Sequence, residues 1–135
     1  CSREYPGWGY SAVNGATTMW ERWNSYTKEK GFGDVSMNSF NHYSFGSVAE
    51  WMFKYCLGIR PDIDGAGFTK LTLCPAPDVS GKLTHAEGSY DSKKGKISVS
   101  WKAEEGEIKY FACVPKEIDL TLDMPENVVA EIERY

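Results

Sequence analysis

The sequence has no long apolar run and no excess of positive charge. A membrane-spanning helix needs about 20 consecutive apolar residues, and no segment of the 135-residue chain approaches that length. The chain has 15 Lys and Arg against 19 Asp and Glu, which gives a formal net charge of −4. No basic stripe is present that would hold phosphate groups. We therefore expect neither a membrane nor a nucleic acid as partner.

The sequence is also poor in metal ligands and in paired cysteines. Only two histidines are present, His42 and His85, and the four cysteines are far apart: Cys1, Cys56, Cys74 and Cys113. There is no C-x-x-C pair, so the usual spacings of a zinc site and of a disulfide framework are both missing. Cys56 and Cys74 lie in apolar surroundings and are expected to be small buried hydrophobic residues.

The most informative stretch is Gly15–Trp23, GATTMWERW, in which one carboxylate lies between two indoles. Aromatic rings stack on the apolar face of a pyranose, and a carboxylate next to them can accept a proton or a hydroxyl hydrogen bond. A second interpretation places Trp20 and Trp23 in a core and pairs Glu21 with Arg22. The residues alone leave both interpretations open.

Helical patterns occupy the first part of the chain. Pro6 and the segment Asn14–Gly15 predict the start and end of a short helix. Residues 24–36 carry turn chemistry and are predicted to be a connecting loop. Apolar residues at steps of three and four predict a helix from about Ser39 to Leu57, ended by Gly58.

After Pro61 the apolar period changes from helical to alternating. Alternating segments are predicted as strands at residues 68–73, 83–90, 97–101, 108–114, 118–122 and 128–132. Short strands separated by turn residues are typical of an antiparallel β-sandwich. The predicted fold class is therefore α+β. The predicted domain boundary separates a helical part, residues 1–62, from a sandwich, residues 63–135. Tyr90, Trp101 and Tyr110 form either a sugar-stacking platform or, as alternation favours, part of the core.

Two motifs in order give a resemblance to a known family. GATTMWERW, followed by MNSFNHYSFGSVAEW at residues 37–51, resembles the C-terminal part of the bacterial α-L-rhamnosidases. Residues 5–10 and 58–62 also fit the family pattern. The resemblance implies the last helical segments of an (α/α)6 catalytic barrel followed by an antiparallel β-sandwich. It also implies an inverting glycoside hydrolase that acts on rhamnose-containing glycosides or polysaccharides.

The resemblance assigns roles to particular residues. Glu21 matches the family's general base, and His42 matches a histidine that contacts rhamnose. Trp20, Trp23 and Arg22 are expected to line the substrate pocket. Inverting glycosidases use two carboxyl groups about 6.5–9.5 Å apart, with a water between the base and the sugar. This chemistry requires no metal and no organic cofactor.

The family's general acid lies upstream, in the rest of the catalytic barrel. The chain does not begin with Met, and we expect it to be excised from a longer polypeptide and to be inactive alone. Two alternatives remain, a noncatalytic carbohydrate-binding sandwich and a purely structural module. Helix 39–57 without barrel neighbours is expected to expose an apolar face and to self-associate. The compartment, whether cytoplasmic, periplasmic or secreted, is left open.

Overall fold

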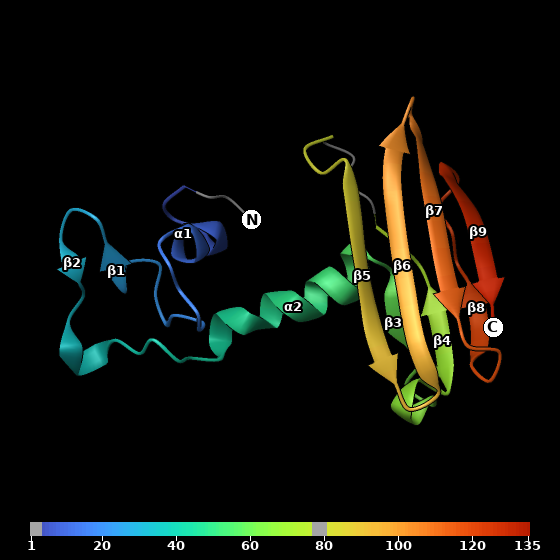
Figure 1. Cartoon of the computed structure of the whole chain (residues 1–135), viewed down its shortest axis with the longest axis horizontal. Helices are drawn as coiled ribbons and strands as arrows, with labels where there is room; N and C mark the ends of the chain where they lie inside the picture. Colours follow the sequence, from blue (N-terminus) through green and yellow to red (C-terminus); the bar gives the residue numbers. More distant parts are fainter. Residues whose placement is uncertain (1–3, 77–80) are drawn as a thin grey trace. The chain divides into compact units, whose positions relative to one another are not determined.

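The computed structural model describes residues 4–76 and 81–135, which form two compact units (Figure 1). The units are Cys1–Ala49, called the N-terminal unit below, and Glu50–Tyr135, called the sandwich unit. Among the described helices, none is both long and apolar enough to cross a bilayer.

The N-terminal unit contains short elements joined by loops. Helix α1 spans Trp8–Val13 and ends at Asn14, after which Gly15 takes a φ of 85°. This confirms the predicted short helix and its end. The predicted loop at 24–36 instead holds a small hairpin, β1 (Tyr26–Thr27) with β2 (Gly31–Phe32), and a 3₁₀ turn, η1 (Val35–Met37). The predicted turn chemistry is present, with Gly31 at a φ of 73°, and the prediction missed only the two short strands.

The predicted helix at 39–57 is shorter and less regular than its apolar period indicated. It consists of a 3₁₀ segment η2 (Ser44–Ser47), one α-helical turn α2 (Val48–Trp51) and a π-helical segment η3 (Met52–Cys56). Residues 39–43 stay outside the helix because their backbone groups bond elsewhere: the N–H of His42 donates to the carbonyl of Met19 at 2.8 Å. Gly58, with a φ of 77°, follows the helix as predicted.

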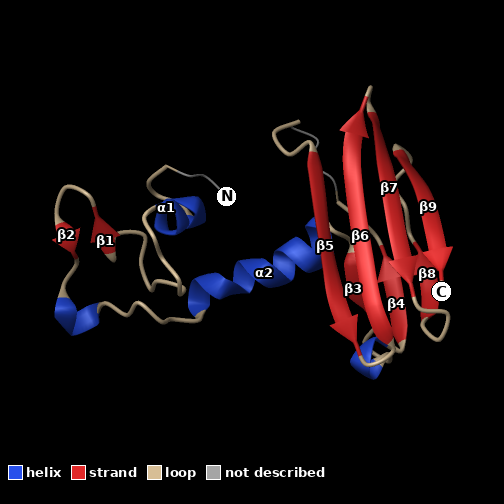
Figure 2. Cartoon of the chain, in the orientation of Figure 1, coloured by secondary structure: helices blue, strands red, loops and turns tan. Residues whose placement is uncertain are grey.

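The sandwich unit has two sheets, which lie one behind the other in Figures 1 and 2. One has the order β3–β4–β8 and the other has the order β5–β6–β7–β9. The strand bounds are β3 (Ile59–Pro61), β4 (Lys70–Leu73), β5 (His85–Ser92), β6 (Gly95–Glu104), β7 (Glu107–Val114), β8 (Asp119–Leu122) and β9 (Val128–Arg134). A 3₁₀ turn, η4 (Ala66–Phe68), precedes β4.

The six predicted strands are all present, and β3 is an additional short one. The sheets are mixed, not purely antiparallel, because β8 pairs with β4 and β9 pairs with β7 in parallel. β8 and β9 return to different sheets instead of forming a hairpin with the strand before them. Alternation within a strand predicts which side chains are buried, but it does not specify the partner strand or its direction.

The core of the sandwich unit is continuous with the end of η3. Its buried residues come from both sheets and include Ile59, Leu71, Leu73, Ile97, Val99, Trp101, Ile108, Tyr110, Ala112 and Val114. The indole Nε1–H of Trp101 donates to the Cys56 carbonyl at 2.8 Å, and the Tyr110 hydroxyl donates to the Leu57 carbonyl at 2.9 Å. Helix-end carbonyls have no partner within the helix, so the sheet supplies one. The sugar-stacking platform proposed for Trp101 and Tyr110 is therefore wrong, because both rings are buried.

Candidate functional site

Two segments of the N-terminal unit lie side by side and bring the candidate site residues together. Residues 18–21 run antiparallel to residues 39–42. The Thr18 hydroxyl donates to the Phe40 carbonyl, and the His42 N–H donates to Met19. These bonds place Glu21 and His42, which are twenty-one residues apart in sequence, on neighbouring segments.

Glu21 is fixed through Ser39 by two reciprocal hydrogen bonds. The Glu21 N–H donates to the Ser39 carbonyl at 2.9 Å, and the Ser39 N–H donates to Glu21 Oε2 at 2.8 Å. Across the described residues, Oε2 is the only carboxylate oxygen of Glu21 with a hydrogen bond. The half-buried side chain therefore has one oxygen held by backbone and one available to bind a water or a hydroxyl group.

Arg22 does not pair with Glu21. In the part of the chain that the structure describes, no ion pair joins the two side chains. The Arg22 N–H donates to Ser25 Oγ at 3.1 Å, and the Arg22 side chain is exposed. Hydrogen bonds from Ser36, with a smaller contribution from the Arg22 charge, hold the pKa of Asp34 below its usual range. The interpretation that pairs Glu21 with Arg22 is thus not supported, and a substrate role for Arg22 stays a prediction.

The two tryptophans that flank Glu21 have different environments. Trp20 is buried and packs edge-on against Phe40 and Tyr26, at centroid distances of 5.4 and 6.2 Å. Trp23 is half-buried and stacks on Phe45, with centroids 4.1 Å apart and the rings 18° from parallel. Trp20 is therefore a core residue of the N-terminal unit, whereas Trp23 retains exposed ring surface. Sugar contact by either ring stays a prediction.

His42 is held before the helix and not in its first turn. Its Nδ1 accepts the Ser44 N–H at 3.3 Å, and its ring stacks on Tyr43 at 5.2 Å, 11° from parallel. Because Nδ1 is an acceptor, the neutral ring carries its proton on Nε2. The Nε2–H is then available as a hydrogen-bond donor, on the opposite side of the ring from the Nδ1 that accepts the Ser44 N–H.

Two residues in this cluster were not identified from the sequence. Ser39 contributes its backbone to the Glu21 carboxylate, which no side-chain pattern signals. Tyr43 is 86% exposed and lies against His42. The signal for Tyr43 was its position directly after the histidine in an aromatic-rich motif. We refer to Glu21, Ser39, His42 and Tyr43 as the Glu21–His42 cluster.

A hollow in the N-terminal unit lies around the β1–β2 hairpin and not at this cluster. Its lining includes Tyr5, Tyr10, Lys28, Phe32 and Asp34, and none of the five predicted site residues. Within residues 4–76 and 81–135, no group of three or more His, Cys, Asp or Glu side chains is arranged to hold a metal ion.

Comparison with known proteins matches both parts of the chain. Residues 1–56 match the model of the bacterial alpha-L-rhamnosidase 6 hairpin glycosidase domain, and residues 58–134 match that of the bacterial alpha-L-rhamnosidase C-terminal domain. The fold and the matched ranges define the end of a helical glycosidase domain joined to a β-sandwich. The chain belongs to the bacterial α-L-rhamnosidase family.

Individual relatives agree with this assignment. An α-L-rhamnosidase of Alteromonas sp. is 40% identical over 127 residues, which are 94% of this chain and 12% of that protein. The crystal structure of Streptomyces avermitilis α-L-rhamnosidase complexed with L-rhamnose is 41% identical, has a TM-score of 0.65 and is matched over 79% of this chain and 10% of its own. The Aspergillus terreus enzyme has a TM-score of 0.78 at 30% identity, over 92% of this chain and 14% of its own. The chain thus spans about an eighth of the relatives' length.

The matched ranges change at residue 57, whereas the compact units divide after Ala49. The predicted domain boundary at residue 62 stays a prediction.

Proposed function

We propose that this chain is the C-terminal portion of an α-L-rhamnosidase and supplies the general base of an inverting hydrolysis. The proposed base is Glu21. The observation that carries the proposal is the reciprocal pairing of Glu21 with Ser39, because it fixes a carboxylate and leaves one oxygen available. A positioned carboxylate of this kind contributes roughly 10²–10⁴-fold to a rate.

In the proposed reaction, the free oxygen of Glu21 takes a proton from a water molecule. The water oxygen bonds to the anomeric carbon of rhamnose from the face opposite the aglycone, while the bond from that carbon to the aglycone oxygen breaks. The aglycone leaves as an alcohol after it receives a proton from a general acid in the rest of the barrel. The proton on Glu21 then returns to solvent, and the sugar is released with inverted configuration.

His42 is proposed to bind a rhamnose hydroxyl as a hydrogen-bond donor through Nε2–H. The bond from the Ser44 N–H to Nδ1 supports this role, since it fixes the tautomer. A structure of the Streptomyces avermitilis relative contains L-rhamnose, which supports rhamnose as the sugar. Trp23, with its exposed ring surface, and Arg22 are proposed to line the pocket. The buried position of Trp20 gives it a supporting role behind Glu21.

The chain alone is proposed to be inactive because the general acid and most of the substrate pocket belong to the rest of the enzyme. Three exposed apolar residues lie at the end of α2 and in η3: Trp51, Met52 and Tyr55, with exposed fractions of 51%, 37% and 45%. We propose that the rest of the barrel covers them in the whole enzyme. In the isolated chain the same residues are proposed to drive self-association.

The proposal is tested by Glu21→Gln in the longer rhamnosidase that contains this chain. The amide keeps the shape of the side chain and the Ser39 contact but cannot accept the proton of water. We expect kcat to fall by roughly 10²–10⁴-fold with little change in KM. Glu29→Gln, an exposed residue of the hairpin turn, is the matched control and should leave kcat unchanged. Unchanged activity of Glu21→Gln would support the structural-module alternative instead.

The noncatalytic alternative assigned sugar binding to Trp101. Its test, loss of binding in Trp101→Ala, would report on folding and not on binding, because the indole is 3% exposed and anchors Cys56. The sandwich therefore offers no sugar-binding surface built on the Trp101 ring.

A further inference from the structure

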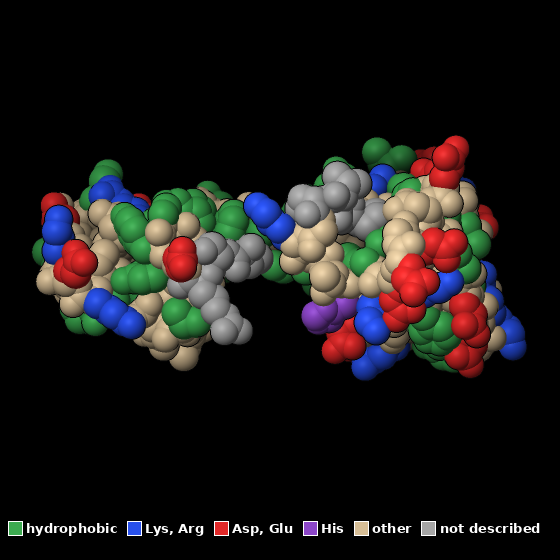
Figure 3. All heavy atoms as spheres, turned by 90° about the horizontal axis from the view of Figure 1, so that it is seen from above, with side chains coloured by type: hydrophobic (Ala, Val, Ile, Leu, Met, Phe, Trp, Pro, Cys, Tyr) green, Lys and Arg blue, Asp and Glu red, His purple; other side chains and the backbone are tan. Residues whose placement is uncertain are grey.

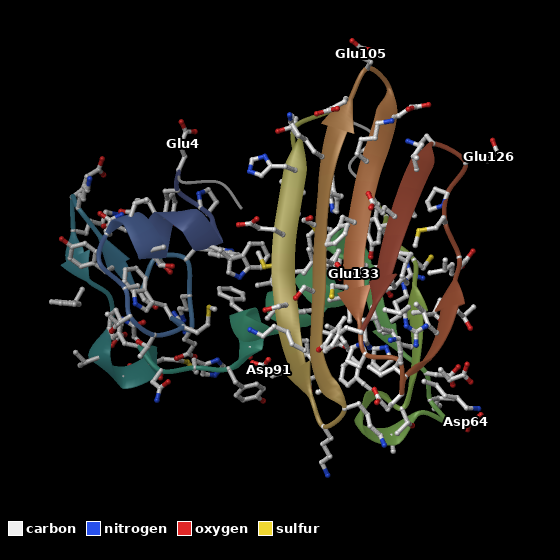
Figure 4. The ribbon with its side chains drawn as sticks, turned by 45° about the vertical axis from the view of Figure 1, so that its right-hand side comes forward. Glu4, Asp64, Asp91, Glu105, Glu126 and Glu133 are labelled. Atoms are coloured by element: carbon white, nitrogen blue, oxygen red, sulfur yellow. The ribbon has the colours of Figure 1, made fainter. Side chains whose placement is uncertain are left out.

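The solvent-facing side of the β5–β6–β7–β9 sheet carries a row of four residues, one from each strand. Glu87 on β5 lies opposite Ser100 on β6, Ser100 opposite Phe111 on β7, and Phe111 opposite Glu131 on β9. Neighbouring strands are about 4.8 Å apart, so the row is roughly 14 Å long. Figure 4 shows side chains leaving this sheet along all four strands, with Glu133 labelled on β9. We call these four residues the Phe111 row.

Phe111 is an exposed aromatic ring between two shallow hollows. It is 38% exposed, while its strand neighbours Tyr110 and Ala112 are buried on the inner face. One hollow is lined by Phe111 and Ser100 together with Lys102, Lys109, Val129 and Glu131. The other is lined by the same two residues together with Glu87, Ser89 and Ser98. The ring thus stands between two concave surfaces that each combine polar and apolar side chains, with Val129 as a second exposed apolar residue beside it.

The hydrogen-bonding groups next to the ring have no partner among residues 4–76 and 81–135. The side chains of Glu87, Ser100 and Glu131 have no hydrogen bond or ion pair to any other described residue. The two nearby lysines are paired along their own strands, Lys102 with Glu104 at 2.8 Å and Lys109 with Glu107 at 3.0 Å. Figure 3 shows acidic and basic side chains intermixed on the visible face of the sandwich unit. The carboxylates of the row are therefore available as acceptors.

We propose that the Phe111 row is a binding site for a neutral oligosaccharide. The ring would stack on the C–H face of a pyranose, and the carboxylates would accept hydrogen bonds from hydroxyl groups on either side. Two carboxylates disfavour an anionic ligand such as phosphate. A protein partner is also disfavoured, because the centre of a protein interface is depleted in charge. The Phe111 ring instead has a carboxylate toward each end of the row. The length of the row suits a short oligosaccharide, and the site does not depend on the role of Glu21.

The experiment is an amide NMR titration of the 135-residue chain with a trisaccharide of α-linked L-rhamnose and, separately, with maltotriose. We expect saturable shifts at Ser100, Phe111 and Glu131 with at least one of the two sugars. Phe111→Ala should weaken binding about tenfold or more, and Phe111→Tyr should preserve it because the ring remains. Phe111→Leu keeps an apolar side chain suited to a strand and should also lose binding.

Two controls separate the site from general effects on the chain. Phe32→Ala removes another exposed ring, 74% exposed in β2, and should leave the affinity unchanged. Glu131→Gln should weaken binding while the amide spectrum of the buried core stays the same. The proposal is overturned if neither sugar shifts the row, if the shifts occur only around Glu21, or if Phe111→Ala and Phe111→Leu bind as well as the unmodified chain.

Discussion

Tyr110 of β7 and Leu57 at the end of the helix are joined by a hydrogen bond from the phenol to the backbone carbonyl, 2.9 Å long. Trp101 of β6 makes the equivalent contact to Cys56. Two buried side chains of the sandwich thus satisfy successive carbonyls at a helix end. Because an unpaired buried carbonyl costs about 1–3 kcal/mol, these contacts fix where the helix stops and the sandwich begins.

The Tyr110 contact predicts a specific pH dependence. Burial raises the pKa of Tyr110 above the ordinary tyrosine value of about 10. Above pH 10 the unfolded chain loses this proton while the folded chain keeps it, so the free energy of unfolding falls as pH rises. Tyr110→Phe lacks this proton. The unmodified chain should be more stable than Tyr110→Phe by about 1–3 kcal/mol at pH 7, and the difference should shrink by up to about 1.4 kcal/mol per pH unit above 10.

Urea unfolding followed by circular dichroism at a series of pH values measures this difference. A difference that stays constant, or that grows, between neutral pH and pH values above 10 would contradict the assignment of a raised pKa to Tyr110.

Gly58 predicts a stability effect from close backbone approach. Its φ is 77°, and an added Cβ would lie 2.4 Å from the backbone nitrogen of Pro75. Gly106 also has a positive φ, 91°, but an added Cβ there meets nothing within 4 Å. Both Ala variants should lose stability because of φ, by about 1–2 kcal/mol. The free energy of unfolding should fall by about 1–3 kcal/mol more in Gly58→Ala than in Gly106→Ala. The reason is that the added Cβ meets backbone atoms of Pro75, which cannot move aside as a flexible side chain could.

The comparison of the two glycine variants by urea unfolding isolates the contact with Pro75. Equal losses for Gly58→Ala and Gly106→Ala would mean that the turn conformation alone explains both.

The exposed apolar residues at the end of α2 and in η3, Trp51, Met52 and Tyr55, predict concentration-dependent self-association of the isolated chain. The double variant Trp51→Ser/Tyr55→Ser should remain monomeric in light scattering across concentrations at which the unmodified chain forms larger species. Ile63→Ser is the matched control, since Ile63 is 98% exposed but lies outside the helix. A monomeric unmodified chain at all concentrations would rule out this surface as a self-association site.

Much of the sandwich could be predicted from the sequence, because the alternation of apolar and polar residues along each strand indicates which face of the strand is buried. Ile97, Val99 and Trp101 were placed on one side, and all three are buried. The parallel pairing of β9 with β7 could not be predicted, since it depends on contacts between distant segments. The same limit applies to the helix start, which local periodicity placed at Ser39 and which tertiary hydrogen bonds to residues 18–21 move to Ser44.

For the candidate site, the motif predicts Glu21 and His42 but not how they are held. The carboxylate is fixed by a backbone N–H of Ser39, and every residue type except Pro offers the same group. Arg22 shows the opposite error: adjacency in sequence suggested an ion pair with Glu21, but Arg22 begins a turn closed by hydrogen bonds with Ser25, and its side chain is exposed. The Phe111 row could not be predicted from the sequence, because its residues come from four strands whose register is set by tertiary pairing.

The central claim, that Glu21 activates the water that attacks rhamnose, is tested most directly by chemical rescue. Glu21→Ala in the longer rhamnosidase leaves space beside the anomeric carbon, and azide needs no base to act as nucleophile. With a rhamnoside that carries a good leaving group, added azide should restore turnover and give the rhamnosyl azide of inverted, β configuration, identified by NMR. Two results would contradict the assignment of Glu21 as the general base. One is a turnover rate of Glu21→Ala, measured without azide, that equals the rate of the unmodified enzyme; the other is an azide product of retained configuration.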